Sequence, residues 1–141
     1  MQSKLVIGHW SLGRGIMLRL EELEIYKLAI ELGEKIWEIV LKWDYFAKDT
    51  VGKQLVRAAD SISANISEGY GRFSYKENKQ FCYYGRGSLM ETKTWLTKAN
   101  NRKLILEKDF RLLLSNLELI HKKLNGYIKS IGIHRSPMTN D

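Results

Sequence analysis

The chain has one proline, one cysteine and no long apolar run among its 141 residues. Proline breaks helix interiors, and a chain whose single proline, Pro137, lies near its end is typical of long helices rather than of β-rich or loop-rich folds. The single cysteine, Cys82, excludes an internal disulfide, and no neighbour gives it the spacing of a metal site. With no disulfide indicated, a cytoplasmic location is the default expectation. A membrane-spanning helix needs about 18 consecutive apolar residues, and no run approaches this length, so we expect no membrane association.

The two ends of the chain differ in pattern from its middle. A short apolar stretch near the N-terminus is interrupted by Gly8, His9 and Arg14 and has no small-residue cleavage site after it, so a signal peptide is not indicated. We expect an N-terminal extension over residues 1–20, one folded domain over 21–132 and a C-terminal tail over 133–141.

Apolar residues recur at spacings of three and four along four stretches of the middle. These stretches begin near Leu23, Val51, Tyr75 and Glu107, and the last one ends near Ile131. Short connections between four amphipathic helices predict an all-α fold, an antiparallel up-down-up-down four-helix bundle.

Several residues have the types that begin or end helices. We expect Thr50 to cap the second helix after a connection over residues 44–50. Gly69 and Gly71 would end that helix in a left-handed conformation. Ser74 and Glu77 have the spacing of a capping box for the third helix.

The net charge of +7 is concentrated in the middle of the chain. Residues 1–50 carry 7 basic and 8 acidic side chains, residues 51–105 carry 10 and 4, and residues 106–141 carry 6 and 4. On the third helix the basic residues and one tyrosine fall opposite the apolar stripe, and neighbouring residues of the second helix extend the set. The candidate nucleic-acid-binding residues are Lys53, Arg57, Arg72, Lys76, Lys79, Tyr83, Arg86 and Lys93.

Cations for phosphates and rings for base stacking are what a reader of single-stranded or looped RNA needs. A charged outer helix face is also the ordinary solvated surface of a bundle, and both interpretations stay open at this point.

No residue pattern indicates catalysis, a cofactor or a metal. His9, His121 and His134 lie in different segments, and Cys82 fits a buried structural thiol better than a nucleophile. The Gly-x-Gly pairs at 69–71 and 85–87 follow no strand and do not match a phosphate-binding loop. We therefore expect a protein that is not an enzyme.

The segment at residues 54–72, QLVRAADSISANISEGYGR, closely resembles a bacterial family first met as proteins encoded inside intervening sequences of 23S ribosomal RNA genes. The resemblance continues through LEIYKLA at 23–29 and GSLME at 87–91, and covers residues 20–131. It implies an all-helical bundle that forms a ring-like homopentamer, without known catalytic activity and with a proposed RNA-binding role. Related accessory proteins of diversity-generating retroelements bind a reverse transcriptase and nucleic acid through a basic surface.

The matching segment also contains polar residues beside small or apolar ones. Together with Arg57 they predict a hydrogen-bond network between helices, and direct ligand contact is the alternative. The members of this network are Ser61, Asn65, Glu68 and Glu91.

Two functions remain open from the sequence. The first is an oligomeric module that binds RNA through the basic face, and the second is a scaffold that docks an acidic protein or a reverse transcriptase. Homo-oligomerisation is also indicated by aromatics that one small bundle would not bury fully. These aromatics are Trp37, Tyr45, Phe46 and Tyr70.

Overall fold

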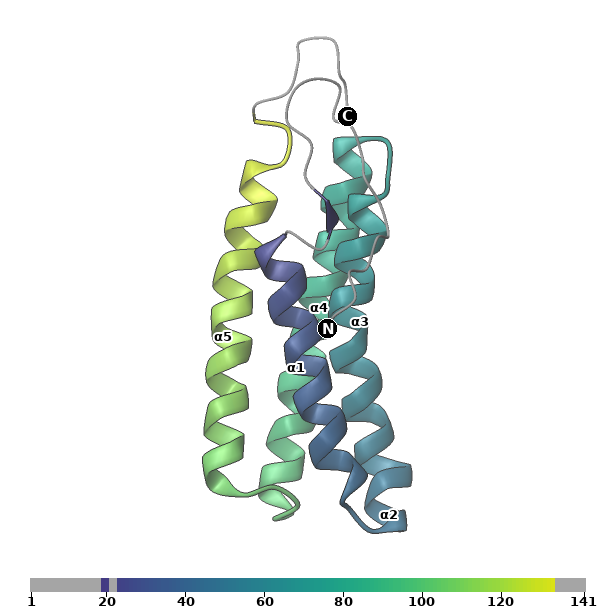
Figure 1. The fold of residues 1–141 in the computed structure, drawn as a ribbon, viewed down its shortest axis with the longest axis vertical. Coiled ribbons are helices and arrows are strands. Elements are labelled where there is room, and N and C mark those ends of the chain that lie inside the picture. Colours follow the sequence, from purple (N-terminus) through teal and green to yellow (C-terminus); the bar gives the residue numbers. More distant parts are fainter. Residues whose placement is uncertain (1–18, 21–22, 134–141) are drawn as a thin grey trace.

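The computed structural model describes residues 19–20 and 23–133, and four long helices form an antiparallel bundle within them (Figure 1). This confirms the predicted fold. Most of the proposed extension at 1–20 and of the tail at 133–141 lies outside the described residues. The long helices are α1 (Glu24–Leu41), α3 (Lys53–Tyr70), α4 (Tyr75–Asn101) and α5 (Glu107–Ser130).

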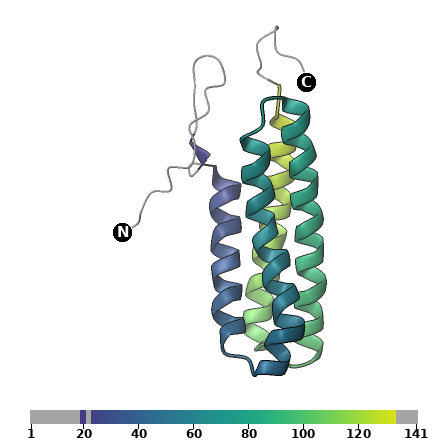
Figure 2. The same ribbon diagram turned by 90° about the vertical axis from the view of Figure 1, so that its right-hand side faces the viewer.

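The four helices occupy the corners of a square. Helices α3 and α5 each pack on both α1 and α4, so α1 and α4 stand at opposite corners. Figure 2 shows these two helices at the two edges of the bundle. One consequence is that α4 has two flanks, one against α3 and one against α5.

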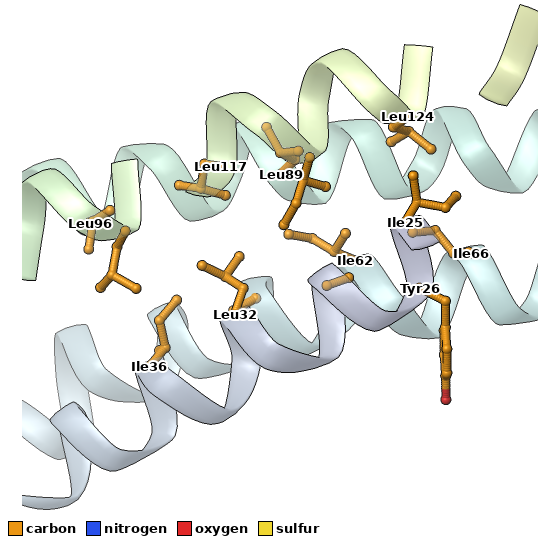
Figure 3. Packing of buried hydrophobic residues seen from close by; sticks show 14 of the residues in the cluster. Ile25, Tyr26, Leu32, Ile36, Ile62, Ile66, Leu89, Leu96, Leu117 and Leu124 are labelled. Atoms are coloured by element: carbon orange, nitrogen blue, oxygen red, sulfur yellow. The ribbon is translucent and has the colours of Figure 1, made fainter. Parts of the chain in front are cut away.

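The core is built from the apolar stripes of all four helices, which meet in the centre of the bundle (Figure 3). Leu32 and Ile36 of α1 and Leu117 and Leu124 of α5 are almost completely buried. Ala58, Ala59 and Gly85 keep side-chain volume small between α3 and α4, so these two helices approach closely. A methyl group built on Gly85 would lie 3.5 Å from the carbonyl oxygen of Ile62, an ordinary van der Waals contact, so Gly85 faces the α3 backbone and alanine would fit there as well.

The connection between the first two long helices differs from the prediction. Asp44, not Thr50, is the cap: its carboxylate accepts a hydrogen bond of 2.9 Å from the Ala47 amide. Helix α2 (Tyr45–Ala47) then runs through a π-helical turn, η2 (Lys48–Gly52), directly into α3. The wider turn interrupts the 3.6-residue period of apolar residues, because the adjacent residues Val51 and Gly52 are both buried.

The glycines at the end of α3 also act differently from the prediction. Gly71 ends the helix with a φ of −84°, so neither left-handed geometry nor glycine's freedom is used there. Gly69 is instead a close-contact position, since a methyl group built on it would lie 2.9 Å from the carbonyl oxygen of Asn78. The next helix begins as predicted at Ser74, whose hydroxyl accepts a 3.1 Å hydrogen bond from the Glu77 amide.

Candidate nucleic-acid interface

The eight predicted basic and aromatic residues come from α3, from α4 and from the turn between them. Arg86 faces the α5 flank of α4, where it bonds to α5, whereas Lys53 and Arg57 lie on α3. Ile62 of α3 packs on Gly85 of α4. Lys53 lies nine residues before Ile62, and Lys76 lies nine residues before Gly85. Because the helices are antiparallel, these two lysines are about 27 Å apart along the bundle axis. The same register places Lys53 level with Thr94 and Arg57 level with Met90, so these two residues lie beside the Lys93 end of α4 and far from Lys76.

Two of the predicted cations have partners on their own side of the bundle. Lys53 pairs with Asp49 at 3.1 Å, and Arg72 pairs with Glu68 at 2.8 Å. The Arg72 guanidinium also lies 4.7 Å from the centre of the Phe81 ring. Exposed ion pairs of this kind contribute little stability, but they reduce the charge that these side chains offer to a ligand.

The α5 flank of α4 brings the remaining residues into a defined arrangement. Arg86 donates a 2.8 Å hydrogen bond from Nη1 to Oδ1 of Asn125, which connects α4 to α5. Its guanidinium carbon lies 5.0 Å from the centre of the Tyr83 ring, a cation–π distance. These two contacts fix the orientation of a guanidinium that would otherwise be mobile.

An open hollow of about 450 Å³ lies beside this pair, between α4 and α5. Its lining residues are Tyr83, Arg86, Asn125, Ile128 and Lys129. We call this set, with Lys76 and Lys79 along α4, the α4–α5 groove. Within the part of the chain that the structure describes, Lys76, Lys79 and Lys129 form no ion pair. The groove therefore carries cations without nearby carboxylate partners.

Asn125, Ile128 and Lys129 were not predicted as site residues. The signal that could have found them is the register of an antiparallel helix pair. In such a pair, the residue numbers of any two facing residues add up to the same value. The contact between Arg86 and Asn125 sets this sum at 211, so that Ile128 lies level with Tyr83. The sequence interpretation extended the patch towards α3 on the expectation that the second and third helices lie side by side, and it did not consider the α5 side.

The predicted hydrogen-bond network between helices is wrong for this chain. The Ser61 hydroxyl donates to the Arg57 carbonyl at 2.9 Å, and the Asn65 amide donates to the Ser61 carbonyl at 2.8 Å, both within α3. Glu68 pairs with Arg72, and Glu91 is exposed on α4. Ser61 and Asn65 thus bond to the preceding turn of their own helix, a common alternative for short polar side chains within a helix.

A different polar contact does connect α4 and α5 inside the bundle. Asn78 donates from Nδ2 to the Tyr127 hydroxyl at 3.4 Å, and its Oδ1 lies 3.8 Å from the Cys82 sulfur. Burial raises the pKa of the Cys82 thiol to about 12, and burial also raises the pKa of Tyr127 to about 12. Cys82 is thus a buried neutral thiol, as predicted, and not an activated nucleophile.

The described residues show neither metal-site nor membrane-span geometry. Over residues 19–20 and 23–133, no three His, Cys, Asp or Glu side chains gather closely enough to hold a metal ion. In the same ranges, no helix is long and apolar enough to cross a bilayer.

Comparison with known families shows to which family the chain belongs. The sequence profile of the 23S rRNA-intervening sequence protein family matches residues 21–126, most of the bundle. The chain belongs to this family. Membership agrees with the resemblance carried by the segments at 23–29, 54–72 and 87–91.

Comparison with solved structures shows the same fold in another protein. A protein of unknown function from the S23 ribosomal protein family of Bacteroides thetaiotaomicron superposes with a TM-score of 0.68 at 21% identity. The match covers 75% of this chain and 99% of that one, and at this identity it shows the fold alone. A search of curated proteins finds no match to the chain.

Proposed function

We propose that this protein is a non-enzymatic RNA-binding module and that the α4–α5 groove is its binding surface. The observation that carries the proposal is the Arg86 guanidinium, held by Asn125 and by the Tyr83 ring at the mouth of a hollow that Lys129 also lines. An oriented arginine, a second cation and a half-exposed aromatic ring are the groups that bind phosphates and bases.

The electrostatics of the groove support the same function. Lys76 and Lys79 continue the positive charge of Arg86 towards the start of α4, about three helical turns in all. A polyanion lying along this line would meet cations at successive turns, and its binding would release counterions. Lys93 extends the line the other way, but the register places Glu118 level with it, which lowers its contribution.

Charge reversal in the groove tests the proposal against a matched control. We expect K76E/K79E/R86E/K129E to lose RNA binding in fluorescence anisotropy, while wild-type affinity falls steeply as salt rises. The control, K27E/K35E/K42E/K48E, changes the net charge equally but on α1 and the connection that follows it, and should bind nearly as wild type. Equal weakening by both variants would show that total charge, and not the groove, determines binding.

Capture from cells separates RNA from a protein partner. The proposal expects that material bound to the full chain is released by nuclease. A partner that stays bound after nuclease, and that the groove reversal removes, would identify the groove as a docking site for a protein, the alternative raised by the sequence.

We also propose that the module is a homo-oligomer, with the pentamer implied by the family resemblance as its stoichiometry. Ile30, Trp37 and Leu41 form one exposed apolar stripe on α1, and Tyr45 and Phe46 are more than 70% exposed at the end of the bundle. Exposed apolar area of this extent is common at association surfaces. Light scattering should give a multiple of the 16.4 kDa chain mass, and W37E should reduce it.

A further inference from the structure

We infer that the hollow between α4 and α5 holds one unpaired nucleotide, with its base against Tyr83 and its phosphate between Arg86 and Lys129. This inference rests on the proposed function, that the groove binds RNA, and it adds which form of RNA the groove takes. Three features of the hollow support it: the free area of the ring, the fixed arginine and the shape of the site.

The Tyr83 ring is a stacking surface that is only partly used. The Arg86 guanidinium lies over it, yet the side chain remains 42% exposed. Bases inside a duplex already stack on their neighbours, so only an unpaired base has a free face for an aromatic side chain. The ring therefore selects single-stranded or looped segments.

The fixed arginine supplies donors that point to a known place. One N–H of Arg86 is used by Oδ1 of Asn125, and the planar guanidinium retains four others. Guanidinium groups bind phosphate oxygens through two parallel hydrogen bonds, and an arginine already held in place loses less entropy when it does so. The Nδ2 group of Asn125 has no partner among the described residues, so it can donate to the edge of a bound base.

The size and surroundings of the hollow fit a nucleotide in a strand. Its volume of about 450 Å³ lies within the range of sites for small organic ligands, roughly 300–1,000 Å³. Ile128 gives the hollow an apolar wall. Because the hollow is open to solvent, the RNA strand can continue out of it, past Lys79 and Lys76. These lysines begin about 6 and 10 Å from Tyr83 along α4, where the adjoining phosphates would pass.

The substitution Y83L tests the inference, because it removes the aromatic ring of Tyr83 without changing the charge of the groove. The probe is a fluorescein-labelled, unstructured 12-nucleotide RNA, used alone and annealed to its complement. We expect the single strand to bind the wild-type chain at least about fivefold more tightly than the duplex. Y83L should weaken single-strand binding about 5- to 100-fold, the effect of losing one stacked base, and leave duplex binding unchanged.

Two further variants serve as controls. Y83F keeps the ring and should bind within about twofold of wild type. Y84L removes the neighbouring tyrosine, which is also about half exposed but contacts Phe81 edge-on instead of lining the hollow, and should likewise have no effect. Circular dichroism of each variant verifies that the helices are intact, as expected for exposed positions.

The outcomes separate this inference from the proposed function. If the groove reversal abolishes binding but Y83L binds the single strand as wild type does, the groove binds RNA and the nucleotide site is wrong. Equal affinity of wild type for single strand and duplex overturns the inference in the same way. If wild type binds neither RNA, the proposed function fails and the inference with it. A 5-iodouridine probe provides a direct check, since photocrosslinking should attach it to Tyr83.

Discussion

The substitution of glycine by alanine should have opposite effects at two positions of the α3–α4 pair. A methyl group on Gly87 would meet no atom within 4 Å, so G87A should gain the helix propensity that separates alanine from glycine, about 0.8–1 kcal/mol. A methyl group on Gly69 would lie 2.9 Å from the Asn78 carbonyl oxygen and 3.0 Å from Cβ of Phe81. Neither atom is at the end of a flexible side chain, so α3 and α4 must separate to relieve the overlap.

The size of the difference follows from these contacts. Overpacking of a close interface costs about 1–3 kcal/mol, and the gain in helix propensity offsets up to about 1 kcal/mol of it. We therefore expect G69A to be destabilised by about 0–2 kcal/mol, and to lie about 1–3 kcal/mol below G87A. Asn78 also holds the contact with Tyr127 across the bundle, so movement at Gly69 would disturb that hydrogen bond as well.

Urea and thermal unfolding at one fixed protein concentration would measure both variants. For a helical domain of this size, 1 kcal/mol corresponds to a change in Tm of about 4 °C. The concentration is held constant because association would add its own stabilisation. If G69A raises the Tm as much as G87A does, the close approach of α3 and α4 does not limit the volume at this position and the packing account is refuted.

Three further predictions concern stability and reactivity. D44A should cost about 1 kcal/mol in urea unfolding, since the cap of α2 is lost, whereas T50A should cost less. The unfolded chain ionises Cys82 from pH 9.0 and Tyr127 from pH 10.0, but the folded chain only near 12. The free energy of unfolding should therefore be highest below pH 9. Above pH 9 the Cys82 thiol should lower it by about 1.4 kcal/mol per pH unit, and above pH 10 Tyr127 should lower it by the same amount again. C82A should remove the fall between pH 9 and 10, and a fall that persists there would contradict the assignment. Ellman's reagent at pH 8 should label Cys82 of the folded chain much more slowly than the urea-unfolded chain, and equal rates would show that the thiol is accessible.

The fold could be predicted from the sequence because apolar or small residues recur at spacings of three and four along each long helix. Leu113, Leu117, Ile120 and Leu124 of α5 repeat at three and four, and all four are buried. The corner between α1 and α3 could not be predicted in this way, since a π-helical turn changes the period at Val51 and Gly52. There the pattern indicates a loop where the backbone is still helical.

The candidate site was only partly predictable because its residues come from two helices. Periodicity places Lys79, Tyr83 and Arg86 on one side of α4, but it does not say which helix covers the edge of that side. Asn125 and Lys129 become site residues only through the pairing of α4 with α5. Side-chain bonding was also beyond the sequence, because Ser61 can bond across an interface or back to its own helix with the same residue type.

The position of α1 and α4 at opposite corners of the bundle has a consequence for the proposed binding of RNA by an assembly. Helix α4 forms the groove with α5, whereas the apolar stripe of Ile30, Trp37 and Leu41 is on α1. Subunits that join through α1 would leave every groove open, so one assembly would present several identical sites to one strand. Weak single contacts would then add through effective concentration, and a long RNA would be held far more tightly than a short one of the same sequence.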